Sequence, residues 1–558
     1  MKATSLIVDD SIRRDAAPAR PRRTFADLPG PRGLPVVGHL LALHPDRWHL
    51  DFERWWRAHG DLFAVRLGRK PILVVADGEL VRDVLQRRPA VFRRMRTIED
   101  VSREADMVGL FSADGDAWRK QRQLISPTFH ARHVEGFFPS ISAITGRLRA
   151  LWAQAADERA ARDVLGDLMR YSVDVTSSVA FGRDLDTLAR GPDALQEHLQ
   201  RVFLGLNRRM LAPLPYWRYL GLPADRAYDR AIASVKRFIL DLVTAARREI
   251  EGGADRPARP RTLLELMIAA RDGEDPKARL SDAEVYANVL TMLLAGEDTT
   301  ANTLAWILYY LGSRPDVQAR AREEADRVVG GALIPTLEQS KRLEYTGAVA
   351  HEALRLRSAA PLLYLEANHD TVVGDVAVPA GAGVVALTRA AGRKPEYFGD
   401  PESFRPERWL GGAPATLPHE PRMALAFGGG PRICPGRSMA LLECAVTVGM
   451  VLRSFTVELA DPAAPVRERM AFAMQPEGLR IRFTTRAREL TRRAARELTR
   501  RASASAPALR LTAPWRGPRR SRAPARSPGR APRGRPCSAR RARGPRARAS
   551  RRAARPPA

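Results

Sequence analysis

Cysteine is scarce in this sequence. Only Cys434, Cys444 and Cys537 occur among 558 residues, which is too few for a disulfide framework in a chain of this length. The scarcity favours a reducing compartment and leaves any special cysteine chemistry to a single thiol.

Long apolar runs are missing too: no run of roughly 18 apolar residues occurs, and the amino-terminal sequence lacks the apolar core of a signal peptide. We therefore expect a soluble, cytoplasmic protein with no membrane span.

Acidic residues and lysine are nearly absent from residues 486–558. This segment holds 24 arginines, no lysine and two glutamates, and it carries +22 of the chain's net charge of +29. Its Pro/Arg/Ala/Ser-rich composition offers too few large apolar side chains to offset the entropy of ordering, which predicts disorder. A basic tail attracts phosphate whatever the base sequence. This one has a single aromatic residue, Trp515, and no folded recognition motif, so we do not expect nucleic-acid binding.

The rest of the sequence has the pattern of one globular unit. We expect a flexible segment at 1–24, a single large domain at 25–485 and the basic tail at 486–558. Helix signals outnumber strand signals, and the clearest strand signals are short, at 62–67, 71–75 and 479–483. The predicted fold class is mainly α with small β-sheets, not an alternating β/α design.

Two predicted helices carry candidate chemistry. Ser281 is an N-cap with Glu284 three residues later in capping-box register, which predicts a long helix that ends near Gly312. A second helix is predicted from about 340 to 357, because it must stop before Pro361.

The long helix contains the sequence AGEDTT at 295–300. A glycine in the middle of a helix costs about 1 kcal/mol relative to alanine. One interpretation is a kink with a few solvated polar residues. The other is that Gly296 lets a flat ligand approach, while Asp298 and Thr299 deliver protons beside it.

Two further pairs of residues are spaced to lie on one face of a helix. Glu352 and Arg355 are three residues apart, and Arg408 could join them in a network rather than a solvated surface pair. Trp118 and Arg122 are one helical turn apart and could together hold a carboxylate. The alternative for these two is an amphipathic surface helix with a buried tryptophan.

Cys434 lies in the glycine-rich sequence FGGGPRICPG at 427–436. Zinc would need about four ligands, and no CxxC or nearby histidine completes a set. A nucleophilic cysteine would need a histidine base, which the sequence does not suggest. A structural thiol leaves the glycines unexplained. A thiolate ligand to haem iron would use an open loop and close backbone approach.

These stretches, in this order and spacing, resemble the cytochrome P-450 family of haem-thiolate monooxygenases. The family's cysteine loop reads F-x-x-G-x-R-x-C-x-G and its central helix carries A/G-G-x-D/E-T, together with E-x-x-R, P-E-R and W-x-x-x-R elements. The matching residues are Phe427, Gly430, Arg432, Cys434 and Gly436; Ala295, Gly296, Asp298 and Thr299; Glu352 and Arg355; Pro406, Glu407 and Arg408; and Trp118 and Arg122. The chain departs from the family's frequent pattern at Ser358, where a proline is common, and at GRKP, 392–395, where His-Arg-Asp-Pro is common.

The resemblance implies haem b with Cys434 as iron ligand. It implies that Trp118, Arg122 and Arg432 hold the haem propionates, and that Phe427 and Gly436 lie on the cysteine side of the ring. On the other side, Ala295 and Gly296 would make room for O2, while Thr299 and Asp298 would supply protons. Glu352, Arg355 and Arg408 would form a structural network that fixes the cysteine loop.

The resemblance also outlines a substrate pocket. The residues implied to line it are Leu110, Phe111, Leu294, Ala295, Pro361, Leu362, Phe472 and Ala473. They are apolar, which favours a lipophilic substrate such as a fatty acid or a terpenoid. The tail is too short for a flavin reductase, so the expected electron donor is a separate ferredoxin or flavodoxin, with Arg119 and Lys120 as docking candidates. The alternatives are a peroxide-driven peroxygenase and a haem sensor or carrier without turnover.

Overall fold

The computed structural model describes residues 22–486, apart from 192–193, 213, 253–261, 272–279 and 412–416. The segment predicted to be flexible at 1–24 and the basic tail at 486–558 therefore lie almost entirely outside the described residues.

Helices make up most of the described chain, as predicted. They are α1 (Trp48–His59), α2 (Gly78–Gln86), α3 (Arg96–Glu104), α4 (Gly115–Ile125), α5 (Ala131–Gly136), α6 (Phe138–Asp157), α7 (Val164–Phe181), α8 (Thr187–Arg190), α9 (Ala194–Leu211), α10 (Pro223–Gly252), α11 (Leu263–Arg271), α12 (Asp282–Ser313), α13 (Pro315–Val329), α14 (Leu337–Ser340), α15 (Glu344–Leu356) and α16 (Arg437–Ser454).

The strands form small sheets. A five-stranded sheet has the order β1 (Leu62–Leu67), β2 (Lys70–Val75), β8 (Gly383–Ala386), β5 (Leu363–Ala367) and β3 (Phe92–Arg94). The other sheets are β4 (Ala161–Arg162), β12 (Ile481–Thr485) and β9 (Phe455–Leu459); β10 (Arg467–Met470) with β11 (Met474–Glu477); and β6 (Thr371–Val373) with β7 (Val376–Val378). The predicted strands at 62–67 and 71–75 are confirmed, and the one at 479–483 begins two residues later than predicted.

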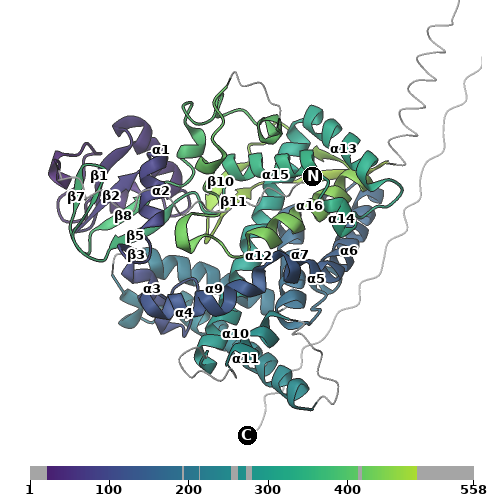
Figure 1. The fold of residues 1–558 in the computed structure, drawn as a ribbon, viewed down its shortest axis with the longest axis horizontal. Coiled ribbons are helices and arrows are strands. Elements are labelled where there is room, and N and C mark those ends of the chain that lie inside the picture. Colours follow the sequence, from purple (N-terminus) through teal and green to yellow (C-terminus); the bar gives the residue numbers. More distant parts are fainter. Residues whose placement is uncertain are drawn as a thin grey trace, which may run out of the picture. The chain divides into compact units, whose positions relative to one another are not determined.

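Helix α12 is the long helix predicted from the sequence. The Ser281 side chain accepts a hydrogen bond from the Glu284 backbone N–H, and the Glu284 side chain accepts one from the Ser281 N–H, which completes the capping box. Its 32 residues contact α7, α10, α15 and α16 (Figure 1). The helix is apolar on most sides because it is packed on most sides, and it forms one wall of the cavity described below.

The helix predicted from 340 to 357 begins later, at Glu344. Its first turn is capped by Glu324 of α13, which accepts hydrogen bonds from the backbone N–H groups of Tyr345 and Thr346. A carboxylate near a helix N-terminus satisfies donors that the helix itself cannot. The cap comes from another helix, so the local sequence pattern did not reveal where α15 starts.

Candidate active site

The cysteine loop is a tight turn that leads into α16. The Cys434 backbone N–H donates to the Phe427 carbonyl over 3.0 Å, and Gly436 is the N-cap of α16. Gly430 has a φ of +64°, and a Cβ there would lie 2.4 Å from the Leu85 carbonyl oxygen at the end of α2. Glycine is required at this position both for its conformation and for the close approach to α2.

The Cys434 thiol is exposed into a cavity whose wall it forms. Burial from bulk solvent raises the pKa of this thiol, and hydrogen bonds from the backbone N–H groups of Gly436 and Arg437 and the positive charge of Arg122 act in the opposite direction. These donors are placed to stabilise a thiolate once a metal cation replaces the proton.

The cavity has a volume of about 600 Å³ and separates the cysteine loop from α12. Cys434 and Phe427 line one side, while Ala295, Gly296 and Thr299 of α12 line another. Of the residues expected to form the substrate pocket, those in the cavity wall are Leu110, Phe111, Leu294, Ala295, Leu362, Phe472 and Ala473. Pro361 is buried outside the wall, and its carbonyl accepts a hydrogen bond from the Arg389 N–H.

Trp118, Arg122 and Arg432 come together at one edge of the cavity, as expected for residues that hold one ligand. The Arg432 guanidinium carbon lies 4.6 Å from the centre of the Trp118 ring. The same guanidinium donates to the Ala113 carbonyl and to Asp114, each over 2.7 Å. Burial lowers the pKa of both arginines.

Arg88 and Arg94, which no sequence motif had indicated, also line the cavity. Burial and the nearby Arg432 lower the pKa of Arg88 to about 9, and its Nε and Nη2 atoms have no partner among the described residues. Arg94 donates to the Phe111 carbonyl over 2.5 Å. Arg87, next to Arg88 in sequence, instead pairs with Asp83 at 2.9 Å, and no local pattern distinguishes the two.

This edge of the cavity has an excess of positive charge. Arg88, Arg122 and Arg432 face it together, and Asp114 is the carboxylate that moderates the charge of Arg88 and Arg432. Buried guanidinium groups without partners are costly, so the cluster calls for an anionic ligand. The two propionates of haem b, with the apolar macrocycle in the cavity and Cys434 on one side of it, fit this donor set.

The polar residues of α12 differ in their access to the cavity. Thr299 lines it, and its hydroxyl donates to the Ala295 carbonyl over 2.7 Å. Asp298 is buried outside the wall, where its carboxylate accepts hydrogen bonds from the Asn302 side chain over 2.8 Å and from the Ala473 N–H over 3.0 Å. Burial raises the pKa of Asp298 to about 6.

Gly296 lies in the cavity wall, but its lack of a side chain serves a helix contact. A Cβ at Gly296 would lie 2.4 Å from the Thr176 hydroxyl oxygen on α7. One of the two interpretations of the sequence is that this glycine lets a flat ligand approach. The structure shows that the missing side chain lets α12 pack closely against α7.

Two buried glutamates were also missed. Both carboxyl oxygens of Glu297 lack a partner among the described residues, and burial raises its pKa well above the ordinary value. Glu443 of α16 borders the cavity, and burial raises its pKa to about 8. An acidic residue within an apolar helical pattern gives no local sequence signal that distinguishes burial from exposure.

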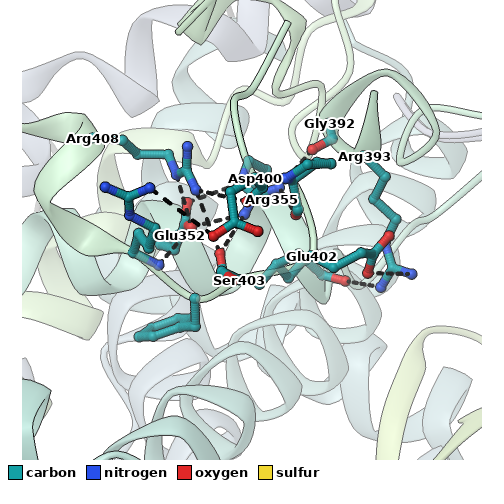
Figure 2. A network of polar contacts seen from close by, with 12 residues as sticks. Glu352, Arg355, Gly392, Arg393, Asp400, Glu402, Ser403 and Arg408 are labelled. Carbon is teal, nitrogen blue, oxygen red and sulfur yellow. Dashed lines mark hydrogen bonds and ion pairs between the residues drawn. The ribbon is translucent and has the colours of Figure 1, made fainter. Parts of the chain in front are cut away.

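Glu352, Arg355 and Arg408 form a buried network, shown in Figure 2. Arg355 donates to both Glu352 oxygens over 2.9 and 2.7 Å, and Arg408 donates to Glu352 over 2.9 Å. The free N–H groups of the two arginines bind backbone carbonyls, including those of Gly392 and Gly399. The network therefore holds the segment 392–409 directly. None of the network's hydrogen bonds within the described residues reaches 427–436, the loop it was expected to fix.

Burial alone would raise the pKa of Glu352, but the hydrogen bonds and charges of Arg355 and Arg408 outweigh it and the pKa is lowered. Glu352 is therefore a carboxylate in a fully paired environment.

The alternatives for Cys434 find no support in the described residues. No group of three or more His, Cys, Asp or Glu side chains that could hold a metal ion occurs there. No histidine lines the cavity in that part of the chain, so a nucleophilic thiol has no histidine base beside it. Among the described residues, no helix combines the length and the apolar composition that a membrane crossing requires.

The chain is similar to known proteins in sequence and in fold. The chain is 33% identical over 433 residues to cyclooctat-9-en-7-ol 5-monooxygenase of Streptomyces melanosporofaciens, which covers 78% of this chain and 90% of that protein. It is 28% identical over 462 residues to human cytochrome P-450 3A5, covering 81% and 89% of the two chains. The crystal structure of the cytochrome P-450DA haem domain superposes with a TM-score of 0.73 at 27% identity, covering 82% of this chain and 98% of that one.

Members of the family that these proteins represent bind haem b through a cysteine thiolate. The family profile named cytochrome P450 matches residues 28–483 of this chain. The chain therefore belongs to the cytochrome P-450 family and is a monooxygenase of that type.

Proposed function

We propose that the protein inserts one oxygen atom of O2 into a lipophilic small molecule such as a terpenoid or a fatty acid. The observation that carries the proposal is the position of Thr299 and Cys434 in the wall of one cavity, whose edge has an excess of buried positive charge. When bound there, haem supplies an iron at which O2 is activated, and a thiolate ligand favours cleavage of the O–O bond.

We assign the cofactor contacts as follows. Cys434 would ligate the iron, and Trp118, Arg122 and Arg432 would bind the propionates, with Arg88 as a further anchor. Phe427 and Gly436 would contact the haem beside Cys434, and Ala295 and Gly296 would border the space for O2.

Proton supply is assigned to Thr299 and Asp298. Thr299 and its neighbour Thr300 both line the cavity, and we assign to the Thr299 hydroxyl the role of holding a proton where O2 is activated. The Asp298 carboxyl does not reach the wall, because Asn302 and Ala473 hold it. Its proton can therefore be delivered only after the carboxyl leaves the Ala473 N–H.

The substrate class follows from the cavity wall. The side chains implied as pocket residues and present in the wall, such as Leu110, Leu294 and Phe472, are apolar, so burial of an apolar substrate is the main source of affinity. The relative from Streptomyces melanosporofaciens, cyclooctat-9-en-7-ol 5-monooxygenase, is consistent with a lipophilic substrate.

Electrons are assigned to a separate ferredoxin or flavodoxin, and the protein to the cytoplasm, with residues 25–485 as the catalytic domain between the segments 1–24 and 486–558. The docking candidates Arg119 and Lys120 are ion-paired with Asp116 and Glu284. A docking partner that uses them must compete with these carboxylates. Because salt screens the attraction between the partner and the two basic residues, we expect electron transfer to slow as salt is added.

The test is a turnover assay with isotopically labelled dioxygen. The haem-loaded protein, a ferredoxin with its reductase and a panel of terpenoid and fatty-acid substrates should give a product with one labelled oxygen atom. A product oxygen that comes from water would contradict the proposal. Turnover that needs peroxide and no electron donor would also contradict it and would favour a peroxygenase. Haem binding without product from any of the panel would favour a sensor or carrier.

A further inference from the structure

The turn between β10 and β11 forms part of the cavity wall. Phe472 and Ala473 lie in this turn and line the cavity. The Phe472 ring lies 5.9 Å from the Phe111 ring and 5.3 Å from the Phe203 ring, measured between centroids. One side chain of the turn therefore packs between α9 and the segment that follows α3.

The strands of this hairpin are held independently of the turn. Glu468 Oε2 of β10 accepts one hydrogen bond from Arg389 over 2.8 Å and lies 2.9 Å from His49 Nε2. At the start of β11, the Met474 N–H donates to the Ala359 carbonyl over 2.9 Å. The turn itself is joined to α12 by the hydrogen bond from the Ala473 N–H to Asp298 Oδ2, over 3.0 Å.

Asn302 fixes the carboxyl that receives this bond. Its Nδ2 donates to Asp298 Oδ1 over 2.8 Å and to the Asp298 carbonyl over 2.7 Å. The four-residue spacing on α12 places the two side chains on the same face. One carboxyl oxygen of Asp298 therefore accepts a hydrogen bond from Asn302, and the other accepts one from the turn. Asn302 itself is fully buried.

We propose that Asn302 is a positioning residue, which holds the Asp298 carboxyl against the Ala473 N–H and thereby fixes Phe472 in the cavity wall. The inference deepens the proposed function, because the wall it shapes is that of the proposed substrate pocket. It has a mechanical consequence: a carboxyl that turns toward the cavity to give up a proton also releases the turn. Proton delivery by Asp298 and the position of Phe472 are therefore coupled.

Three variants of the haem-loaded full chain separate the roles of these residues. Asp298→Ala removes the acceptor of the Ala473 N–H, and Asn302→Leu removes the group that orients it. Asp298→Asn removes the acid but keeps an acceptor, and its amide can donate to Asn302 Oδ1, which has no partner in the described structure. Tyr286→Phe is the matched control, since it deletes one unpartnered buried atom of α12.

The first measurement is amide hydrogen exchange of the peptide that spans 466–479. Loss of a buried hydrogen bond to a carboxylate should speed exchange in this peptide by about tenfold in Asp298→Ala and Asn302→Leu. Asp298→Asn and Tyr286→Phe should exchange at the wild-type rate. Wild-type exchange in Asn302→Leu would overturn the proposal, and so would equal acceleration in Asp298→Asn and Asp298→Ala.

The second measurement is spectral titration with imidazole and with 4-phenylimidazole, which both ligate haem iron through nitrogen. The phenyl group of 4-phenylimidazole adds an apolar surface that the wall formed by Phe472 would contact. The Kd of 4-phenylimidazole relative to that of imidazole should rise by roughly three- to tenfold in Asp298→Ala and Asn302→Leu, the loss expected for one aromatic contact, and stay unchanged in Asp298→Asn. An unchanged ratio in all variants would overturn the claim that the turn shapes the pocket. Failure of the proposed function is distinguishable, because a wild-type protein that binds haem but oxidises no substrate leaves both measurements readable.

Discussion

The Arg432 guanidinium stacks on Trp118 at 4.6 Å and donates to Asp114, so one side chain of the cysteine loop is joined to the start of α4. The loop that carries the thiol and the helix that carries Arg122 are thereby placed as one unit. Arg88 reaches the same edge of the cavity from the end of α2 but has no carboxylate bonded to it. This arrangement makes Arg88 the clearest single test of how the cofactor is anchored.

Replacement of Arg88 should weaken haem retention. A charge-assisted hydrogen bond contributes about 1.5–3 kcal/mol, so Arg88→Ala should speed haem loss by roughly 10- to 100-fold. The measurement is transfer of haem to excess apomyoglobin. Arg87→Ala is the matched control, because Arg87 points to Asp83, and it should lose haem at the wild-type rate. Equal retention in Arg88→Ala and Arg87→Ala would remove Arg88 from the binding site.

The network around Glu352 should be essential for stability. Arg355→Ala leaves the fully buried Glu352 charge short of a partner, which should cost about 3–5 kcal/mol. Arg201→Ala breaks the exposed ion pair with Glu197 and should cost less than about 1 kcal/mol. Denaturant unfolding of the haem-loaded variants measures both. A similar loss in the two variants would show that the Glu352 network is no stronger than a surface pair.

Glu443 should make stability fall as pH rises. Its pKa is about 8 in the folded protein, so the folded chain keeps a proton that the unfolded chain releases above its ordinary, lower pKa. The free energy of unfolding therefore decreases between that ordinary pKa and pH 8, by up to about 1.4 kcal/mol for each pH unit. Above pH 8 Glu443 causes no further decrease. Thermal unfolding at pH 6 and pH 8 should show a smaller decrease in Tm for Glu443→Gln than for wild type. Equal decreases in Tm for Glu443→Gln and wild type would contradict the conclusion that Glu443 is a buried, protonated acid.

Thr299→Ala should uncouple electron consumption from product formation. The variant keeps the thiolate but loses the hydroxyl that lines the cavity, so product should fall by roughly 100-fold while electrons are diverted to peroxide. The ratio of peroxide to consumed reductant measures this effect. Thr291→Ala is the control, because Thr291 also lines the cavity and also donates to the carbonyl four residues before it. Coupling as tight in Thr299→Ala as in Thr291→Ala would refute the proton assignment.

Local sequence signals predicted what local interactions determine. The capping box of Ser281 and Glu284 follows from a motif of a few residues, and the structure contains it. The proximity of Trp118 to Arg432 is different, because it was implied only by the family resemblance and not by a local pattern.

The features that escaped prediction depend on contacts between distant segments. Asp298 is bonded to Ala473, 175 residues away, so an acid expected beside the cavity is held outside it. Arg87 and Arg88 are indistinguishable in sequence, yet Arg88 is buried at the cavity, whereas Arg87 forms an ion pair with Asp83 of α2. The reason for Gly296 lies at Thr176 on another helix. Burial and partner choice of this kind are decided by tertiary packing.

The most direct test of the account is a carbon monoxide difference spectrum of the reduced protein, wild type against Cys434→Ser. We predict the long-wavelength Soret band of a thiolate-ligated iron in wild type and its loss in Cys434→Ser. Cys444→Ser should keep the band, because burial in α16 raises the pKa of that thiol and holds it protonated. A wild-type protein that binds haem without this band, or a Cys434→Ser variant that retains it, would contradict the central claim.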